Sequence, residues 1–148
     1  MVRRKNILLV DDDIAVREAL VNALETESYH VVHAANTKDA VQEFLNNPID
    51  VALLDLNLGK ESGWDVLQRL MEIRPSLPTI IISAEPDKFE HPLAWAVKVL
   101  MEKPLNLSAL FKALNLFASE TREDPTLLRT RFITSKSGSI NANLTFCP

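Results

Sequence analysis

Residues 7–13 read Ile7-Leu8-Leu9-Val10-Asp11-Asp12-Asp13, a short unbroken apolar run that ends in three carboxylates. An apolar run of this length without alternation is typical of a strand buried on both faces, as in a parallel sheet. The change to acidic residues at position 11 marks the carboxyl end of that strand. This stretch therefore predicts a buried strand of a parallel sheet with acidic residues at its carboxyl end.

Three further apolar runs follow, the last of them interrupted by Lys98, and helical periodicity fills the spaces between the runs. The runs lie at 51–54, 80–82 and 97–100, and the more polar 30–34 is typical of an edge strand. Helical spacing of apolar residues covers 16–24, 40–45, 62–71 and 107–117. Candidate helix caps are Thr37, Ser62 with Asp65, and Asn106, whereas Pro86 and Pro92 predict a short or irregular helix. Alternating strands and helices predict a doubly wound parallel sheet with helices on both faces.

Length and composition limit the domain organisation. The chain has 148 residues, a net charge of -4 and a single cysteine, Cys147, so an internal disulfide is excluded. We expect one domain over residues 1–117 and a flexible tail over 118–148 without a recognisable output domain. The apolar run after the basic start is too short for a signal peptide, and no run could cross a bilayer. We therefore expect a cytoplasmic protein without membrane contact.

Chemistry-bearing residues follow four of the expected strands. Asp11 and Asp12 follow the first, Asp55 the third, Ser83 the fourth and Lys103 the fifth. The carboxyl ends of parallel strands share one edge, which is where such sheets bind ligands. Carboxylates close together repel one another and favour a hard cation such as Mg²⁺. Asp55 could then attack phosphorus as a nucleophile, with Lys103 and Ser83 contacting the phosphoryl oxygens.

Each of these residues taken alone has a simpler structural interpretation. An aspartate run before a helix can serve only as a cap, Asp55 can close a strand in a turn, and Lys103 can be a solvated lysine. The functional hypothesis depends on their coincidence at matching strand ends.

Residues 5–117 resemble a response regulator receiver domain of two-component signalling. The matching motifs are residues 8–13 with Arg17, residues 53–57 with Gly63, residues 82–84, and Lys103-Pro104. The resemblance implies a flavodoxin-like five-stranded sheet in the order 2-1-3-4-5. It implies Asp55 as the phosphoacceptor, and Asp11, Asp12, Asp55 and the backbone carbonyl of Asn57 as Mg²⁺ ligands. It also implies Ser83 as the switch hydroxyl, Lys103 as the phosphate-sensing lysine and a cis bond before Pro104.

Two positions depart from the family pattern. Gly59 stands where the family often carries proline, and Leu100 stands where the family has a switch aromatic. The output face beside Leu100 is therefore expected to work without a rotating ring. Asn57 and Glu85 occupy positions that tune hydrolysis of the phosphoaspartate in the family, and both are polar, which predicts a short-lived phosphoryl group. Trp64 and Trp95 are expected to be packing residues.

The leading hypothesis is a phosphorylation-controlled switch in a phosphorelay, not a turnover enzyme. The implied partners are a sensor histidine kinase or a histidine phosphotransfer protein, an unknown downstream protein, and a second copy bound through the fourth helix, fifth strand and fifth helix. Alternatives are a degenerate receiver that binds a partner without phosphorylation, and an aspartyl-phosphate phosphohydrolase. The hydrolase needs a second acid two residues after the nucleophile, where this chain has Asn57. Direct DNA binding is not expected, because residues 118–148 lack a helix-turn-helix pattern.

Overall fold

A computed structural model describes residues 4–119 and 131–133 of the chain. Its residues divide into two compact units, Met1–Leu77 and Pro78–Pro148. The expected tail, 118–148, lies mostly outside the described residues. Within the described residues, no helix combines the length and the hydropathy needed to span a membrane.

The first unit is built on three parallel strands, β1 (Asn6–Val10), β2 (His30–Ala34) and β3 (Val51–Asp55). β1 lies in the middle, because Leu8 pairs in register with Val32 of β2 and with Ala52 of β3. All five residues of β3 are buried, as the unbroken apolar run predicts. Each fully buried leucine or isoleucine of these strands contributes about 1.5–3 kcal/mol to stability.

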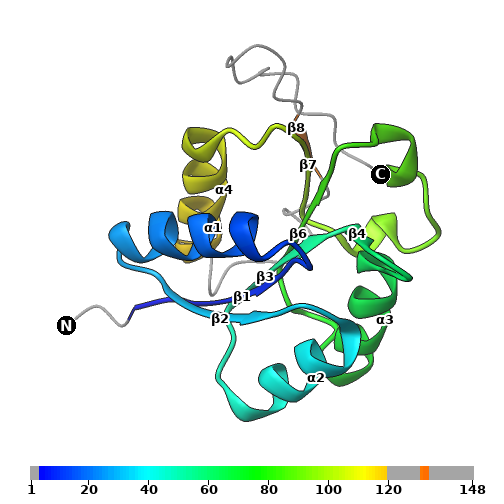
Figure 1. The fold of residues 1–148 in the computed structure, drawn as a ribbon, viewed down its shortest axis with the longest axis horizontal. Coiled ribbons are helices and arrows are strands. Elements are labelled where there is room, and N and C mark those ends of the chain that lie inside the picture. Colours follow the sequence, from blue (N-terminus) through cyan, green and yellow to red (C-terminus); the bar gives the residue numbers. More distant parts are fainter. Residues whose placement is uncertain (1–3, 120–130, 134–148) are drawn as a thin grey trace. The chain divides into compact units, whose positions relative to one another are not determined.

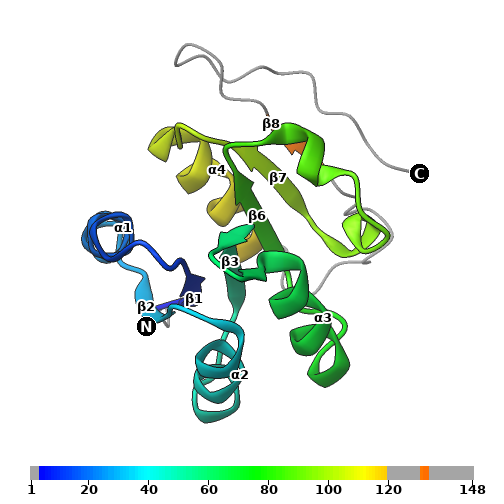
Figure 2. The same ribbon diagram turned by 45° about the vertical axis from the view of Figure 1, so that its right-hand side comes forward.

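Three helices cover this unit: α1 (Ile14–Thr26), α2 (Thr37–Asn46) and α3 (Gly63–Ile73). α1 packs on one face of the strands, and α2 and α3 pack on the other (Figures 1 and 2). Each helix turns an apolar stripe inward, with Leu20 and Leu24 buried in α1, Phe44 in α2 and Leu67 and Leu70 in α3. A short antiparallel hairpin, β4 (Asn57–Leu58) and β5 (Glu61–Ser62), joins β3 to α3.

The second unit contains β6 (Thr79–Ser83), β7 (Val99–Glu102), β8 (Arg131–Ile133) and helix α4 (Leu107–Ser119). β6 and β7 are parallel, with Ile81 opposite Leu100. Asn106 accepts a hydrogen bond from the backbone of Ala109, so its predicted role at the start of α4 is confirmed. The stretch between β6 and β7 holds only two 3-10 helices, Pro86–Phe89 and Ala94–Ala96, as its prolines predict.

The fold class is the expected one. The parallel strands follow the order β2-β1-β3-β6-β7, which matches a 2-1-3-4-5 flavodoxin-like sheet. β8 adds a short parallel strand beyond β7, within the segment where we expected only a tail.

Three sequence expectations need correction. The cap of α2 is Asn36, whose side chain accepts from the N–H of Asp39, and Thr37 is the first helical residue. The strand expected at 97–100 runs from Val99 to Glu102, because Val97 still belongs to the end of the preceding 3-10 helix. Trp64 is buried as expected, but 69% of the Trp95 surface is exposed, so Trp95 is not a core residue.

Candidate functional site

The three aspartates after β1 have separate structural roles. Asp13 caps α1, since its Oδ1 accepts hydrogen bonds from Ala15 N at 2.9 Å and Val16 N at 3.2 Å. Asp11 is buried with 2% of its surface exposed, and its Oδ1 accepts from Asp13 N at 2.9 Å. Helix capping therefore accounts for Asp13 alone and leaves Asp11 and Asp12 for other chemistry.

Asp55 ends β3 and meets the first two aspartates. Carboxylate oxygens of Asp11, Asp12 and Asp55 all lie within 4.8 Å of one another. Asp55 is buried with 6% of its surface exposed, whereas Asp12 is exposed to solvent. One Asp55 oxygen, Oδ1, accepts a hydrogen bond from Asn57 N at 3.0 Å. The first unit thus gathers three carboxylates from two neighbouring strands at one open edge.

The donor set suits a hard divalent cation. The three carboxylates repel one another at this spacing, and the burial of two of them reduces the screening of this repulsion by water. Mg²⁺ prefers oxygen ligands, accepts a small number of carboxylates and keeps several waters. The exposure of Asp12 leaves the cluster open to solvent on one side, which is compatible with such retained waters. These residues therefore fit Mg²⁺.

The loop after Asp55 is a two-residue hairpin turn. Asn57 pairs with Ser62 and Leu58 with Glu61, so Gly59 and Lys60 form the turn. Gly59 has φ +70°, a left-handed conformation that suits glycine at the first position of such turns. The departure from proline at this position therefore has a local cause, because proline cannot adopt a positive φ.

Gly63 holds α3 close against the end of β3. Its N–H donates to Leu56 O at 3.1 Å, and a Cβ at this position would collide with the backbone carbonyl of Asp55. The adjacent Ser62 and Asp65 form the predicted capping box, with Ser62 N donating to Asp65 Oδ2 at 3.0 Å. Gly63 belongs to one of the matching motifs, but the motif by itself does not reveal this steric requirement.

Ser83 and Lys103 belong to the second unit and lie together there. Ser83 ends β6, has 4% of its surface exposed and accepts through its backbone oxygen from Lys103 N at 2.8 Å. Its hydroxyl accepts from Glu85 N at 3.0 Å and donates to Glu85 O at 3.2 Å. The Lys103–Pro104 peptide bond is cis. Ser83 and Lys103 thus come from adjacent strand ends of one unit.

The two other positions singled out in the sequence have contrasting environments. Leu100 is buried in β7 with 1% of its surface exposed. Glu85 is exposed and forms an ion pair with Lys88 at 3.1 Å. Leu100 is therefore part of the core, and Glu85 is open to solvent.

The model for the response regulator receiver domain matches residues 7–115. The chain belongs to this family. It is therefore a receiver domain of two-component signalling and a member of a class of signalling modules. The match covers β1 to α4 and includes Asp11, Asp12, Asp55, Ser83 and Lys103.

Three comparisons illustrate the relationship of this receiver domain to known proteins. The regulatory protein VirG of Rhizobium rhizogenes is 35% identical over 81 residues, which cover 55% of this chain and 33% of VirG. The chain thus spans about a third of the length of that relative. The response regulator TrrA of Thermotoga maritima, solved with Mg²⁺ and BeF, is 26% identical with a TM-score of 0.71, covering 76% of this chain and 98% of TrrA. The structure of the histidine kinase ThkA in complex with TrrA contains a chain that is 26% identical to this one, with a TM-score of 0.69. The match covers 76% of this chain and 97% of the matched chain.

Proposed function

We propose that this receiver domain is a Mg²⁺-dependent phosphoacceptor that becomes phosphorylated on Asp55. The observation that carries the proposal is the cluster of Asp11, Asp12 and Asp55, with carboxylate oxygens within 4.8 Å of one another. Family membership supports it, as does the Mg²⁺–BeF complex of TrrA. Asp11, Asp12, Asp55 and the Asn57 carbonyl would hold the ion, which would neutralise charge on the phosphoryl group when bound.

The proposed reaction is a phosphoryl transfer to a carboxylate. A carboxylate oxygen of Asp55 attacks phosphorus, an O–P bond forms, and the bond from phosphorus to the donor atom breaks. With a phosphohistidine donor, the electron pair stays on the imidazole nitrogen, which takes up a proton. The Asn57 N–H, 3.0 Å from Asp55 Oδ1, orients the carboxylate for this attack.

Ser83 and Lys103 are proposed to sense the phosphoryl group, as their family positions imply. Lys103 would contribute a positive charge and Ser83 a hydrogen bond. The Ser83 hydroxyl donates to Glu85 O and accepts from Glu85 N, so donating to a phosphoryl oxygen requires that its bond to Glu85 O breaks. The proposed switch therefore begins as a rearrangement of residues 83–85, at the entry to the 3-10 helix Pro86–Phe89.

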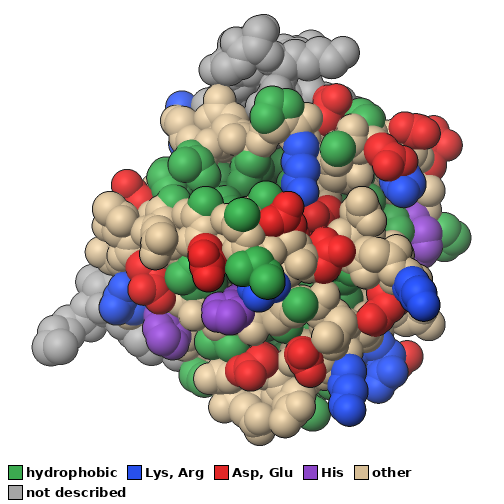
Figure 3. All heavy atoms as spheres, in the orientation of Figure 1, with side chains coloured by type: hydrophobic (Ala, Val, Ile, Leu, Met, Phe, Trp, Pro, Cys, Tyr) green, Lys and Arg blue, Asp and Glu red, His purple; other side chains and the backbone are tan. Residues whose placement is uncertain are grey.

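The proposed partners follow from this chemistry. The ThkA–TrrA complex supports a histidine kinase as the donor, and a histidine phosphotransfer protein would serve equally. An unidentified downstream protein or a second copy of the chain would read the state of the face around the 3-10 segment, β7 and α4. Acidic and basic side chains are interspersed on the face shown in Figure 3, which supports protein contacts over DNA binding. The proposed donors imply a cytoplasmic location.

Lifetime of the phosphoryl group is part of the same proposal. Asn57 and Glu85 are both exposed polar residues, and both can orient water for attack on the phosphoaspartate. We propose self-dephosphorylation that limits the lifetime of the phosphoryl group, and no turnover of external phosphoesters. Sustained hydrolysis of a phosphomonoester would instead support the phosphohydrolase alternative.

The decisive experiment uses the full chain, Mg²⁺ and a small acyl phosphate, with intact-mass detection. One acid-labile phosphoryl group is expected on the wild type and none on Asp55→Asn or after chelation of Mg²⁺. A wild type without an adduct would favour the degenerate receiver, and an undiminished adduct on Asp55→Asn would remove Asp55 as the acceptor.

A further inference from the structure

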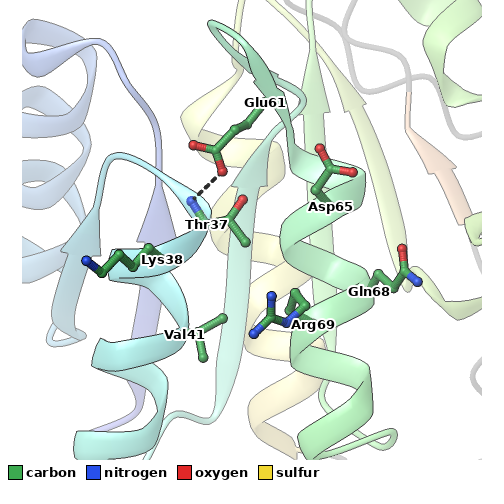
Figure 4. A pocket seen from close by; sticks show the side chains of 7 residues that line it. All are labelled: Thr37, Lys38, Val41, Glu61, Asp65, Gln68 and Arg69. Carbon is green, nitrogen blue, oxygen red and sulfur yellow. Dashed lines mark hydrogen bonds between the residues drawn. The ribbon is translucent and has the colours of Figure 1, made fainter.

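We propose that Glu61 is a positioning residue for the metal-binding loop, an inference that rests on the proposed function because it requires Mg²⁺ at the carboxylates. Its Oε1 accepts a hydrogen bond from Thr37 N at 3.1 Å. Figure 4 shows this bond between the β4–β5 hairpin and the first residue of α2. Asn57, whose carbonyl is a proposed Mg²⁺ ligand, lies in β4, and Glu61 lies in β5, the strand that pairs with it, so the bond restrains the hairpin to which this ligand belongs.

The hairpin is too short to hold its shape unaided. It contains two residue pairs, and even longer isolated two-stranded hairpins are marginally stable. Its base is anchored by the bond from Asn57 N to Asp55, but its turn is supported locally by a bond of 3.4 Å from Gly59 N to Asn57 Oδ1. The Glu61 carboxylate adds an attachment near the turn, to a separate element.

α2 provides a firm and charge-matched anchor. The first N–H groups of a helix have no partner within the helix and form its positive end, where a carboxylate is favourable. Asn36 satisfies Asp39 N at 2.8 Å, and Glu61 satisfies Thr37 N. Ala40 and Phe44 bury the other face of α2. The helix is therefore fixed by packing, and the N–H of Thr37 at its start offers Glu61 a defined attachment point.

The hairpin turn also approaches the metal cluster. A Cβ built on Gly59 would lie 3.7 Å from Oδ2 of Asp12. The hairpin thus faces Asp12 on one side and the start of α2 on the other. If Mg²⁺ requires the hairpin in this position, the Glu61 bond and the ion stabilise each other, since coupling between two binding events is reciprocal.

The space beneath Glu61 is a groove and not packed core. Its volume is about 570 Å³, and Figure 4 shows it between α2 and α3. The lining side chains are Thr37, Lys38, Val41, Glu61, Asp65, Gln68 and Arg69. Glu61 itself is exposed, so its truncation leaves no cavity in the core and the variant is expected to fold.

The test is a Mg²⁺ titration of the full chain without a phosphodonor. The NMR chemical shifts of the Asp12 and Asn57 amides report the binding. Glu61→Ala is expected to weaken Mg²⁺ binding roughly tenfold, as loss of a group that orients metal ligands does. Glu61→Gln keeps an oxygen acceptor and is expected to bind Mg²⁺ within about twofold of the wild type. Lys60→Ala, an exposed change in the same turn, is the matched control and should bind like the wild type.

A second measurement follows the amide of Thr37 directly. Mg²⁺ is expected to slow hydrogen exchange at this amide in the wild type and to leave it unchanged in Glu61→Ala. The glutamine and alanine variants lose the same charge beside α2, so any difference between them isolates the hydrogen bond from a general loss of stability.

The outcomes separate this inference from the proposed function. Wild-type affinity in Glu61→Ala, or an equal loss in Glu61→Ala and Glu61→Gln, would overturn the positioning role while leaving the metal site intact. A wild type that shows no Mg²⁺-dependent shift at Asp12 or Asn57 would overturn the metal site and the inference together.

Discussion

Gly63 has no side chain, and this allows α3 to lie against the end of β3. A Cβ there would lie 3.1 Å from the Cα of Leu56, 3.0 Å from the carbonyl carbon of Asp55, and closer still to the carbonyl oxygen. These are backbone atoms that cannot rotate away. The backbone of Asp55, the proposed phosphoacceptor, is thus held directly against the start of α3.

Gly63→Ala is therefore expected to destabilise the protein by about 3 kcal/mol, the upper end of ordinary overpacking. Gly59→Ala is the matched control, because its Cβ would have an ordinary 3.7 Å neighbour and only the positive φ would cost about 1 kcal/mol. Urea denaturation of both variants measures the difference. A loss for Gly63→Ala no larger than that for Gly59→Ala would contradict the steric argument.

Functional residues that directly follow a buried strand could be predicted from the sequence. Asp11, Asp12 and Asp55 could be grouped because each follows a buried apolar run, and the first unit brings them together. The bond between Glu61 and Thr37 could not be predicted, because the residues are 24 apart in sequence and no pattern links Glu61 to the helix start at Thr37. Contacts between exposed polar residues leave no periodic signal.

At the scale of elements, Arg74 joins α3 to α2 and to the segment before β3. Its guanidinium donates to the carbonyl of Ile49 and lies over the Phe44 ring, 5.4 Å from the ring centre. Burial lowers the pKa of Arg74, and the charge of Asp50 raises it in part. One partly buried cation thus connects three segments of the first unit.

Arg74→Gln is expected to lower the free energy of unfolding by about 2 kcal/mol, since a charged hydrogen bond and a cation–π contact are lost together. Arg69→Gln is a suitable comparison on the same helix. Arg69 is largely exposed and pairs with Glu72 at 4.0 Å, so its loss is expected to cost under about 0.5 kcal/mol. Thermal denaturation measures the difference between the two variants. An equal decrease in their unfolding midpoints would contradict the larger role predicted for Arg74.

Helices and long strands were predictable, and the shortest elements were not. The apolar stripes predicted α1 to α4, and the capping box at Ser62 was correct. β4 and β5 have two residues each and β8 has three, too few for alternation to be recognised. The cap of α2 was misplaced by one residue because asparagine and threonine both cap helices well.

At the scale of the whole molecule, one family spans both units. The match to residues 7–115 includes the carboxylate cluster of the first unit and the Ser83–Lys103 pair of the second. The five main strands and their order followed from apolar runs and from the resemblance. β8 did not, because it adds a strand beyond the region that the family match covers.

β8 pairs with the outer side of β7, opposite the side that pairs with β6. Its register places Phe132 beside Leu100 and Ile133 beside Met101. Without it, β7 would present unpaired N–H and C=O groups, which favour pairing with another chain. A three-residue strand has few hydrogen bonds, so its attachment is expected to be weak.

Replacing both Phe132 and Ile133 with proline removes two consecutive N–H donors, and at least one of them faces β7 in a strand. This variant is expected to self-associate more than the wild type, with a larger weight-average sedimentation coefficient at the same concentration. Replacing the same two residues with alanine keeps both N–H groups and is the control. Equal sedimentation of the proline and alanine variants would argue against a shielding role for β8.

The contrasting tryptophans give each unit a native optical label. Trp64, in α3 of the first unit, has 6% of its surface exposed, whereas Trp95 in the second unit has 69% exposed. A collisional quencher such as iodide reaches an exposed indole and not a buried one. Under iodide the remaining emission comes chiefly from Trp64, so light from the unit that carries Asp55 can be followed without any added dye.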